Sequence, residues 1–346
     1  PDLVIASSIN MRYSEELDYL KAAMQLGIPS MILVQSWDHL TTKGIYHAIP
    51  DMVVAWNNNH AGELMSIHGV PQDKIVISGS PFFDKWFLPP PVKVDREMFC
   101  RQFGLDPLRP YILYLGSSAN IAEDESWLVR ALSEKLKHSQ NEALRKAGIL
   151  VRPHPANWKP MANFKEEGVV VWPAPSEFKI LDFESDEGTA WLKASLENAL
   201  CTVGVNTSAM IDAVLLNKPC YAVVTGNYSL TQEQAKHFQN LVAYNVLDIV
   251  PDAAHCVLAF EKLLNGGDKK EAMRRKFIRE FARPHGFTLS AGEIQAVAVE
   301  EVARGANKRQ IEDAIALAIA AVDRTQEAQH TAFTPITPIT LPLPVS

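Results

Sequence analysis

The sequence predicts an α/β protein with two Rossmann-like parallel-sheet domains, the first of them truncated, and a helical C-terminal segment. Short apolar runs rich in β-branched residues alternate with longer amphipathic segments, which is the pattern of βαβ units in a parallel sheet. The alternation breaks at the prolines of residues 89–91 and restarts at Tyr111, which indicates a domain boundary. At 346 residues, the chain is long enough for two domains with a core each.

The composition limits the classes of function. Hydrophobic residues make up 47% of the chain and charged residues 21%, as in globular proteins. The net charge of -7 argues against a general nucleic-acid binder. No apolar run approaches the ~20 residues of a membrane span and no signal peptide is recognisable, so we expect a cytoplasmic protein, with attachment to the inner face of the membrane left open. The four scattered cysteines are expected to be buried and reduced.

The first domain is expected at residues 1–90. Apolar runs predict strands at residues 2–7, 30–35, 51–56 and 74–78, and amphipathic segments predict helices at residues 14–26 and 59–68. Gly27 is placed to end the first helix. Because Pro1 leads straight into a strand, we expect the natural N-terminus to be missing and this domain to be incomplete. Asp38 follows the second strand, and α/β proteins bind ligands at the carboxyl ends of such strands.

Residues 91–108 are expected to form a linker with one short helix, and residues 109–288 the second domain. Strands are predicted at residues 111–115, 149–152, 169–172, 200–205 and 220–224, and helices at 124–137, 189–198, 232–241, 253–264 and 269–281. A single helix is predicted at residues 291–322, within a C-terminal segment of residues 289–325. The tail of residues 326–346 is rich in proline, so an extended or disordered chain is expected there.

Three loops of the second domain follow predicted strands: Gly116-Ser117-Ser118, Arg152-Pro153-His154-Pro155 and Asn206-Thr207-Ser208. Because the carboxyl ends of parallel strands meet at one edge of a sheet, these loops can surround one ligand. The first loop offers backbone N–H groups, and so does the helix after the third loop, which one of that loop's residues is expected to cap. Arg152 and His154 offer positive charge or hydrogen-bond donors, and Asp212 offers an acceptor for sugar hydroxyls. This set is typical of a site for a diphosphate joined to a ribose.

Several other classes of site are not indicated. The sequence contains no Gly-x-x-x-x-Gly-Lys-Ser/Thr loop, so a P-loop nucleotide hydrolase is not expected. The Gly-x-Gly-x-x-Gly pattern is also absent. Gly-x-Ser-x-Gly is missing as well, which argues against a serine hydrolase of the α/β type. The histidines have no metal-ligand spacing such as His-Glu-x-x-His, so no metal is expected. A separate cofactor is not expected either.

The residues from Ile67 to Pro81, with Asp84 just after them, resemble the end of the first domain in GT-B-fold enzymes. The members most similar are UDP-N-acetylglucosamine 2-epimerases, surface-polysaccharide glycosyltransferases and CDP-glycerol glycerophosphotransferase-like proteins. Arg152-Pro153-His154-Pro155 is similar to the Arg-x-His-Pro segment of the last group. Residues 206–213, followed by Lys218-Pro219, resemble the epimerase segment Ser-Gly-Gly-x-x-Glu-Glu-Ala followed by Gly-Lys-Pro.

The resemblance implies two domains that face each other across a cleft, with the donor nucleotide against the second and the acceptor against the first. Asp212 then corresponds to the acidic residue that holds the ribose. Thr207-Ser208 corresponds to a glycine pair that approaches the phosphates, and both glycines are replaced here. Residues 234–238, which include His237, correspond to a segment near the donor. Residues 283–286 correspond to the start of a C-terminal helix that crosses back to the first domain.

We therefore expect a metal-independent glycosyltransferase of surface-polysaccharide or glycan synthesis. Its donor is expected to be a UDP- or CDP-linked sugar, and its acceptor a glycan or a lipid-linked molecule. Arg152, His154 and the backbone N–H groups of Thr207 and Ser208 are expected to stabilise the leaving diphosphate. Asp38 is the candidate base that deprotonates the acceptor hydroxyl.

Two alternatives stay open at this point. A non-hydrolysing UDP-sugar 2-epimerase would need acidic side chains on both sides of the sugar, and Asp38, Asp84 and Glu125 are the candidates. The other alternative is a degenerate, non-catalytic domain that binds a nucleotide or a partner protein. The sequence also leaves open whether the chain forms a homo-oligomer.

Overall fold

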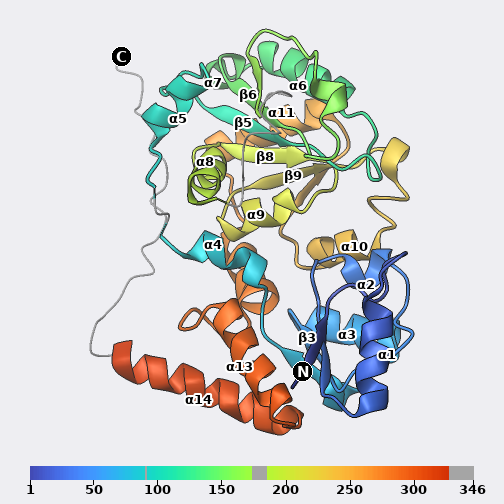
Figure 1. Cartoon of the computed structure of the whole chain (residues 1–346). Coiled ribbons are helices and arrows are strands. Elements are labelled where there is room, and N and C mark those ends of the chain that lie inside the picture. Colours follow the sequence, from blue (N-terminus) through green and yellow to red (C-terminus); the bar gives the residue numbers. More distant parts are fainter. Residues whose placement is uncertain (90–91, 174–184, 327–346) are drawn as a thin grey trace. The chain divides into compact units, whose positions relative to one another are not determined.

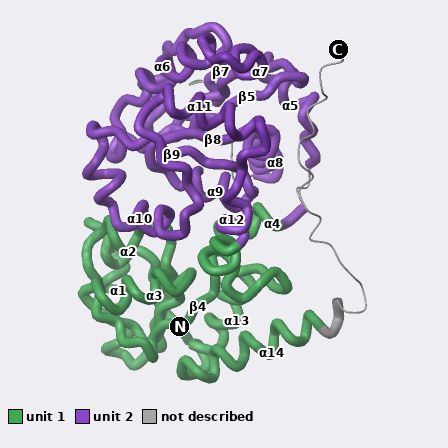
Figure 2. The backbone as a smooth tube through the Cα atoms, turned by 180° about the vertical axis from the view of Figure 1, so that it is seen from behind, with its two compact units in different colours: residues 1–87, 276–335 green, residues 88–275, 336–346 purple. Residues whose placement is uncertain are grey.

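The computed structural model describes residues 1–89, 92–173 and 185–326 (Figure 1). The described chain divides into two compact units: unit 1 comprises Pro1–Phe87 and residues 276–326, and unit 2 comprises Leu88–Arg275 (Figure 2). Each unit contains a parallel sheet with helices packed on it, which confirms the predicted α/β class with two Rossmann-like domains and a helical C-terminal segment. The proline-rich tail lies outside the described residues.

The described part of unit 1 contains four parallel strands in the order β1-β2-β3-β4. They are β1 (Val4–Ala6), β2 (Ser30–Leu33), β3 (Met52–Ala55) and β4 (Ile75–Ile77). The helices are α1 (Glu16–Leu26), α2 (His39–Thr42), α3 (Asn58–Ser66), α4 (Asp84–Phe87), α13 (Ala291–Ala303) and α14 (Lys308–Gln326). Met31, Val54 and Val76 of the sheet share a core with Ile294 of α13 and Ile311 of α14. The C-terminal segment is therefore part of the core of unit 1.

The C-terminal segment differs from the prediction of one helix at residues 291–322. Two helices, α13 and α14, pack against each other instead. Gly305 lies between them with a φ of 79°, in the left-handed region where a residue with a side chain is strained. Asn307 then caps α14, because its Oδ1 accepts the N–H of Gln310 at 3.1 Å. Alanine is frequent on both sides of this turn, which is why the sequence pattern suggested a continuous helix.

Unit 1 also contains residues 276–288, which the sequence assigned to the second domain. The main chain there bonds to the first part of unit 1: the carbonyl oxygen of Phe281 accepts the side-chain amide of Asn57 at 3.0 Å. The ring of His285 lies 2.8 Å from the carbonyl oxygen of Ile77. These contacts are long-range in the sequence, so no local pattern indicates them, although the resemblance to GT-B-fold enzymes implied a return to the first domain from residues 283–286.

Asp84 joins the C-terminal segment to the rest of unit 1. Its carboxylate accepts the N–H groups of Ala291 and Gly292 at the start of α13, each at 2.9 Å, and forms a buried ion pair with Arg283. Arg283 also donates to the carbonyl oxygen of Leu289 at 2.6 Å. Both oxygens of Asp84 are thus engaged in the fold, and Asp84 is poorly suited to the role of a sugar-facing acid in an epimerase.

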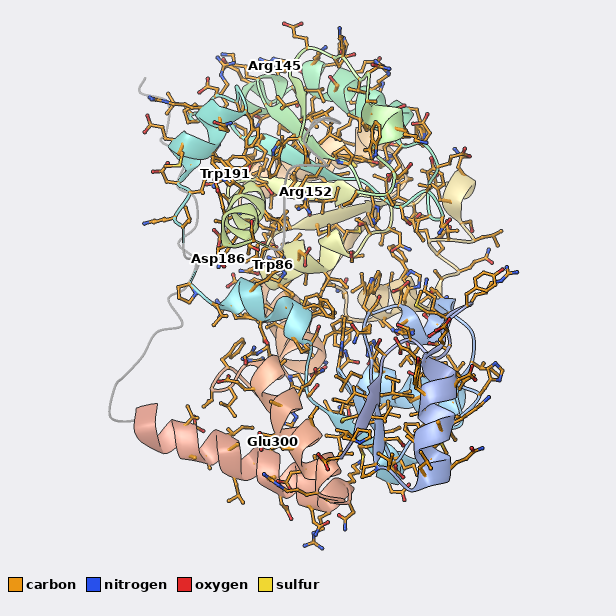
Figure 3. The ribbon with its side chains drawn as sticks, viewed as in Figure 1. Trp86, Arg145, Arg152, Asp186, Trp191 and Glu300 are labelled. Carbon is orange, nitrogen blue, oxygen red and sulfur yellow. The ribbon has the colours of Figure 1, made fainter. Side chains whose placement is uncertain are left out.

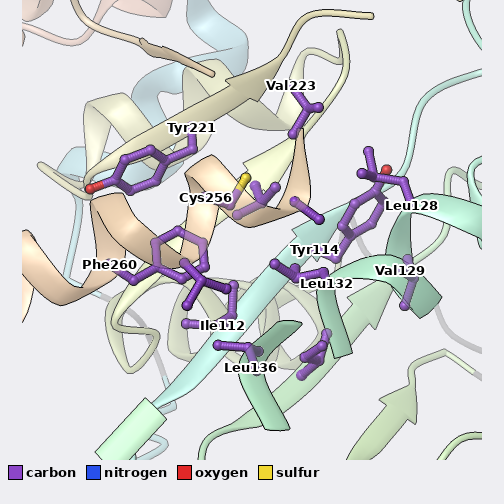
Figure 4. Close-up of a cluster of buried hydrophobic side chains, with 14 of the residues drawn as sticks. Ile112, Tyr114, Leu128, Val129, Leu132, Leu136, Tyr221, Val223, Cys256 and Phe260 are labelled. Atoms are coloured by element: carbon purple, nitrogen blue, oxygen red, sulfur yellow. The ribbon is translucent and has the colours of Figure 1, made fainter. Parts of the chain in front are cut away.

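The described part of unit 2 contains six parallel strands in the order β10-β9-β8-β5-β6-β7. They are β5 (Tyr111–Leu115), β6 (Gly148–Arg152), β7 (Val169–Val171), β8 (Cys201–Gly204), β9 (Cys220–Val223) and β10 (Asp248–Val250). The helices are α5 (Arg96–Gln102), α6 (Ser126–Lys137), α7 (Glu142–Arg145), α8 (Asp186–Glu197), α9 (Ala209–Leu215), α10 (Lys236–Ala243) and α11 (Ala253–Leu264), and α12 (Glu271–Phe277) leads into unit 1. Leu132 of α6 and Phe260 of α11 pack with Ile112 and Tyr221 in one core (Figure 4). All four cysteines are buried and free, as predicted.

The central strands of unit 2 end at one edge of the sheet. Leu115 of β5 pairs with Arg152 of β6 on one side and with Gly204 of β8 on the other. Gly204 is required here, because a Cβ at this position would lie 2.5 Å from the carbonyl oxygen of Leu115. Gly116 is packed nearly as closely, since its Cβ would lie 3.0 Å from the backbone nitrogen of His154. The three loops singled out in the sequence therefore begin side by side.

Candidate functional site

Ser117 connects the loops at the carboxyl edge of the unit 2 sheet. We name them the β5 loop (residues 116–125), the β6 loop (residues 153–158) and the β8 loop (residues 205–208). The N–H and the hydroxyl of Ser117 both donate to the carboxylate of Glu125, at 2.6 and 3.0 Å. The hydroxyl oxygen accepts the N–H of Asn206 at 3.2 Å, and the carbonyl oxygen accepts the side-chain amide of Asn157 at 3.0 Å. Ser117, predicted to bind the donor, thus directs its polar groups to the protein.

Glu125 is a buried carboxylate, 3% exposed, directly before α6. Besides the two bonds from Ser117 it accepts the hydroxyl of Tyr114 at 3.2 Å. Burial raises the pKa of Glu125 to about 7, although these hydrogen bonds favour the charged form. The sequence suggested Glu125 only as an acid for epimerisation. In the structure its oxygens accept hydrogen bonds that shape the β5 loop.

The other two residues of the predicted Gly116-Ser117-Ser118 turn differ in exposure. Gly116 donates its N–H to the carbonyl oxygen of Arg152 at 2.8 Å, so the N–H groups of Gly116 and Ser117 are both used within the protein. Ser118 is half-buried, and its carbonyl oxygen accepts the N–H of Ile121 at 2.9 Å. Of the three, Ser118 is the residue whose side chain reaches the surface.

Asn206 and His237 lie together in the structure. Asn206 is 2% exposed, and its side-chain nitrogen donates to the carbonyl oxygen of Thr231 at 2.7 Å. The same nitrogen lies 3.1 Å from Nε2 of His237 in α10. Because the bond to Thr231 fixes which end of the amide is the nitrogen, Nε2 of His237 is the acceptor and Nδ1 carries the ring proton.

Arg152, labelled in Figure 3, is the last residue of β6 and is half-buried. Burial lowers the pKa of Arg152 to about 10, and the nearby carboxylate of Asp212 opposes this shift. The guanidinium therefore stays charged at neutral pH. Its Nη1 is buried and has no hydrogen-bond partner among the described residues. A buried charged donor without a partner is costly, so this position is suited to an anionic ligand.

His154 contributes a hydrogen-bond donor rather than a charge. Its Nδ1 accepts the N–H of Ala156 at 3.1 Å, so the proton of the neutral ring is on Nε2. Burial and the positive charge of Arg152 lower the pKa of His154. At neutral pH the ring is therefore uncharged, and Arg152 is the member of this pair that supplies positive charge.

The start of α9 lacks the predicted side-chain cap. Ser208 occupies the N-cap position, but its side chain makes no capping hydrogen bond. Its backbone is already helical, with φ -57° and ψ -27°, whereas a capping residue needs an extended backbone. Among the described residues the N–H groups of Thr207 and Ser208 have no acceptor. Asp212 is half-buried in the first turn of this helix.

Asp38, the candidate base, belongs to unit 1 and lies directly before α2. Its carboxylate accepts the hydroxyls of Ser36 and Thr42, the second at 2.9 Å. These bonds fix the direction of the carboxylate within unit 1. Its catalytic role stays a prediction.

Two residues that hold the site together were not singled out in the sequence. Asn157 uses both hydrogens of its side-chain amide, which donate to the carbonyl oxygens of Ser117 and Ala122 at 3.0 and 2.9 Å. Gln232 is fully buried and donates to the carbonyl oxygens of Val205 and Val223 at 2.7 and 2.9 Å. The signal for Asn157 was its place just after the Arg152–Pro155 loop. The sequence contains no such signal for Gln232, because this residue lies in a stretch that the pattern assigned to a helix.

The described residues contain neither a metal-binding cluster nor a membrane-spanning helix. No group of three or more His, Cys, Asp or Glu side chains in them could hold a metal ion. None of the described helices has the length and apolar character needed to cross a membrane.

Solved structures of known proteins match the fold. No family model matches the sequence, and no curated protein does. A putative UDP-N-acetylglucosamine 2-epimerase from Listeria monocytogenes has a TM-score of 0.58 and 10% identity, over 89% of this chain and 76% of that one. UDP-GlcNAc 2-epimerase from Neisseria meningitidis, bound to UDP-GlcNAc, has a TM-score of 0.56 and 14% identity, over 87% and 76%. A variant of the wall teichoic acid polymerase TagF has a TM-score of 0.54 and 10% identity, over 87% and 74%.

At these identities the similarity concerns the fold. The similarity extends over most of this chain and includes both UDP-GlcNAc 2-epimerases and the polymerase TagF. This result agrees with the groups suggested by the sequence. The chain therefore has the GT-B-type fold that UDP-GlcNAc 2-epimerases and TagF share.

Proposed function

We propose that the chain is a glycosyltransferase of the GT-B type that binds the diphosphate of a nucleotide-activated sugar at the carboxyl edge of the unit 2 sheet. The observation that carries the proposal is Arg152, a charged side chain at this edge whose buried Nη1 has no partner among the described residues. Nε2–H of His154 is a second donor for a phosphate oxygen. Asp212, close enough to Arg152 to affect its pKa, is the acceptor proposed for the ribose hydroxyls.

In the proposed reaction the bond between the sugar's anomeric carbon and the diphosphate oxygen breaks, and the acceptor hydroxyl oxygen bonds to that carbon. The hydroxyl proton passes to a base, for which Asp38 is the candidate. The departing diphosphate gains negative charge, which Arg152, Nε2–H of His154 and the N–H groups of Thr207 and Ser208 would stabilise. The proposal includes no metal ion.

The fold neighbours support the nucleotide-sugar part of this proposal, because one of them is bound to UDP-GlcNAc. TagF, named for wall teichoic acid polymerisation, agrees with synthesis of a surface polymer. A UDP- or CDP-linked donor, a glycan or lipid-linked acceptor and a cytoplasmic location are further parts of the proposal.

Calorimetric titration with UDP and CDP tests the site. Wild type should bind at least one of them, and Arg152→Ala should weaken binding about tenfold to hundredfold, the value of one hydrogen bond to a charged group. Arg101→Ala is the matched control, because Arg101 is an exposed arginine of unit 2 that pairs with Glu97 on α5. Equal affinity in wild type and Arg152→Ala would place the diphosphate elsewhere.

The type of reaction needs a second measurement. Incubating wild type with UDP-sugars and no acceptor, followed by NMR of the sugar, should return the sugar unchanged or hydrolysed. Formation of an epimer would contradict the transferase and support the epimerase alternative. Nucleotide binding without turnover across a panel of glycan and lipid-linked acceptors would support a non-catalytic domain.

A further inference from the structure

The hydroxyl of Ser117 stands between a carboxylate and a backbone N–H group. It lies 3.0 Å from Oε1 of Glu125 and 3.2 Å from the nitrogen of Asn206. A hydroxyl has one hydrogen, and a charged carboxylate can only accept. The hydrogen of Ser117 therefore points to Glu125, and a lone pair of its oxygen faces the N–H of Asn206.

The hydrogen bond between Ser117 and the backbone N–H of Asn206 fixes the start of the β8 loop. The side chain of Asn206 is already fixed by Thr231, at 2.7 Å, so the bond from its backbone N–H to Ser117 sets the direction in which the main chain continues. Thr207 and Ser208 come next, with the two N–H groups that are proposed to face the phosphate. Their placement thus depends on a bond that the Glu125–Ser117 pair orients.

The β6 loop is tied to the same segment. The side-chain amide of Asn157 donates to the carbonyl oxygens of Ser117 and Ala122, at 3.0 and 2.9 Å. Gly116 donates to the carbonyl oxygen of Arg152 at 2.8 Å. The β5 loop is therefore the common support of the β6 loop and the β8 loop.

We propose that Glu125 is a positioning residue: its charged carboxylate orients the hydroxyl of Ser117, which holds the β8 loop in place beside Arg152 so that both meet the same ligand. Glu125 itself does not touch the ligand, because it is 3% exposed and both its oxygens accept bonds within the protein. The inference rests on the proposed function only for the identity of that ligand.

Protonation of Glu125 is expected to loosen this arrangement. Among the described residues, the titratable groups that act on Glu125 include Tyr114, Asp124 and Tyr228. Burial raises the pKa of both tyrosines, so they stay neutral around pH 7. Burial also raises the pKa of Glu125 to about 7. Once protonated, Glu125 has a hydrogen to donate, and the hydroxyl of Ser117 is no longer forced to present a lone pair to Asn206.

Hydrogen exchange of the Asn206 amide in the ligand-free protein tests the positioning role directly. In wild type the protection of this amide should fall by about tenfold as the pH is lowered from 8 to 6, after correction for intrinsic exchange. Glu125→Gln should have low protection at both pH values, because its amide can donate to Ser117. Ser117→Ala should do the same, because it lacks the acceptor.

Two controls separate positioning from general loosening. Glu123→Gln removes a negative charge from an exposed side chain of the same loop and should behave as wild type. Amides of β9, which are buried in the core, should exchange equally in all four proteins. If the Asn206 amide exchanges alike in wild type, Glu125→Gln and Ser117→Ala, or if all β8 and β9 amides loosen together, the proposal is wrong.

A titration with UDP and CDP adds the ligand. Glu125→Gln and Ser117→Ala should weaken nucleotide binding about tenfold relative to wild type and Glu123→Gln. If wild type binds neither nucleotide, the proposed function fails while the exchange result still decides the positioning role. If the exchange changes as expected but affinity does not, Glu125 shapes the loop without positioning it for this ligand, which overturns the inference.

Discussion

Acid should destabilise unit 1, because three of its histidines are buried. His60 is completely buried: its Nε2 lies 3.3 Å from the carbonyl oxygen of Trp37, and its ring centroid lies 5.2 Å from that of Trp56. Burial lowers the pKa of His60 to about 4, and the carbonyl oxygen of Trp37 opposes this only in part. Burial also lowers the pKa of His39 and of His68.

The sign of the effect follows from the direction of these shifts. The unfolded chain has a histidine pKa of about 6.5, so it binds protons before the folded chain does as the pH falls. Stability is therefore complete above pH 6.5 and is lost progressively down to pH 4. At 1.36 kcal/mol per pKa unit, His60 alone removes about 2 kcal/mol from the free energy of unfolding between pH 7 and pH 5, and about 3 kcal/mol in the acid limit. His39 and His68 add to the loss.

Urea unfolding of the full chain at pH 7 and pH 5 measures this loss of stability. Hydrogen exchange of the α3 amides at the same two pH values shows whether the loss occurs in unit 1. His60→Gln cannot titrate, so its loss between the two pH values should be about 2 kcal/mol smaller than that of wild type. Comparing the two pH values within each protein removes the cost of the substitution itself. His47→Gln, which changes an exposed histidine of the same unit, should keep the wild-type loss. An equal loss in wild type and His60→Gln would refute the reasoning.

Three further predictions follow from single contacts. Asp84→Ala leaves Arg283 charged and buried, so urea unfolding should show unit 1 destabilised by about 3–5 kcal/mol; a change below 1 kcal/mol would mean that the ion pair is not a structural link. Gly204→Ala places a Cβ 2.5 Å from a carbonyl oxygen of the neighbouring strand and should destabilise unit 2 by about 1–3 kcal/mol, whereas Gly226→Ala, with no atom within 4 Å, should be close to neutral in the same assay. Asp212→Asn should weaken UDP or CDP binding about tenfold to hundredfold with little change in ligand-free melting temperature; unchanged affinity in calorimetry would remove Asp212 from the site.

The fold could be predicted from the sequence because buried parallel strands and amphipathic helices leave local patterns. The strand predicted at residues 200–205 is β8 at Cys201–Gly204, and the helix predicted at 253–264 is α11 with the same bounds. Errors occurred where a contact distant in the sequence or a backbone conformation decided the structure. Gly305 adopts a positive φ within an alanine-rich stretch, and α10 begins at Lys236, four residues later than predicted.

Only the location of the candidate site could be predicted from the sequence. The rule that loops gather at the carboxyl edge of a parallel sheet brought Gly116, Arg152 and Asn206 into one region, and the strand pairing confirms that their loops start there. Which groups face a ligand depends on hydrogen bonds between loops. The hydroxyl of Ser117 looked available in the sequence, but Glu125, eight residues further on, accepts it. No pattern in the sequence indicates that the carboxyl of Glu125 is buried or that its pKa is raised.

These bonds also change which group should contribute most to ligand affinity. The N–H groups of Gly116 and Ser117, which the sequence offered to the phosphates, are donated to Arg152 and Glu125. Because a diphosphate is charged, each hydrogen bond to it is one to a charged group, worth about 1.5–3 kcal/mol, and a positively charged donor adds the attraction between opposite charges. With the β5 loop committed to the fold, the charged guanidinium of Arg152 becomes the strongest donor proposed for the ligand. Binding should therefore weaken more in Arg152→Ala than in His154→Ala, because the ring of His154 is an uncharged donor; a larger loss in His154→Ala would show that position and not charge dominates.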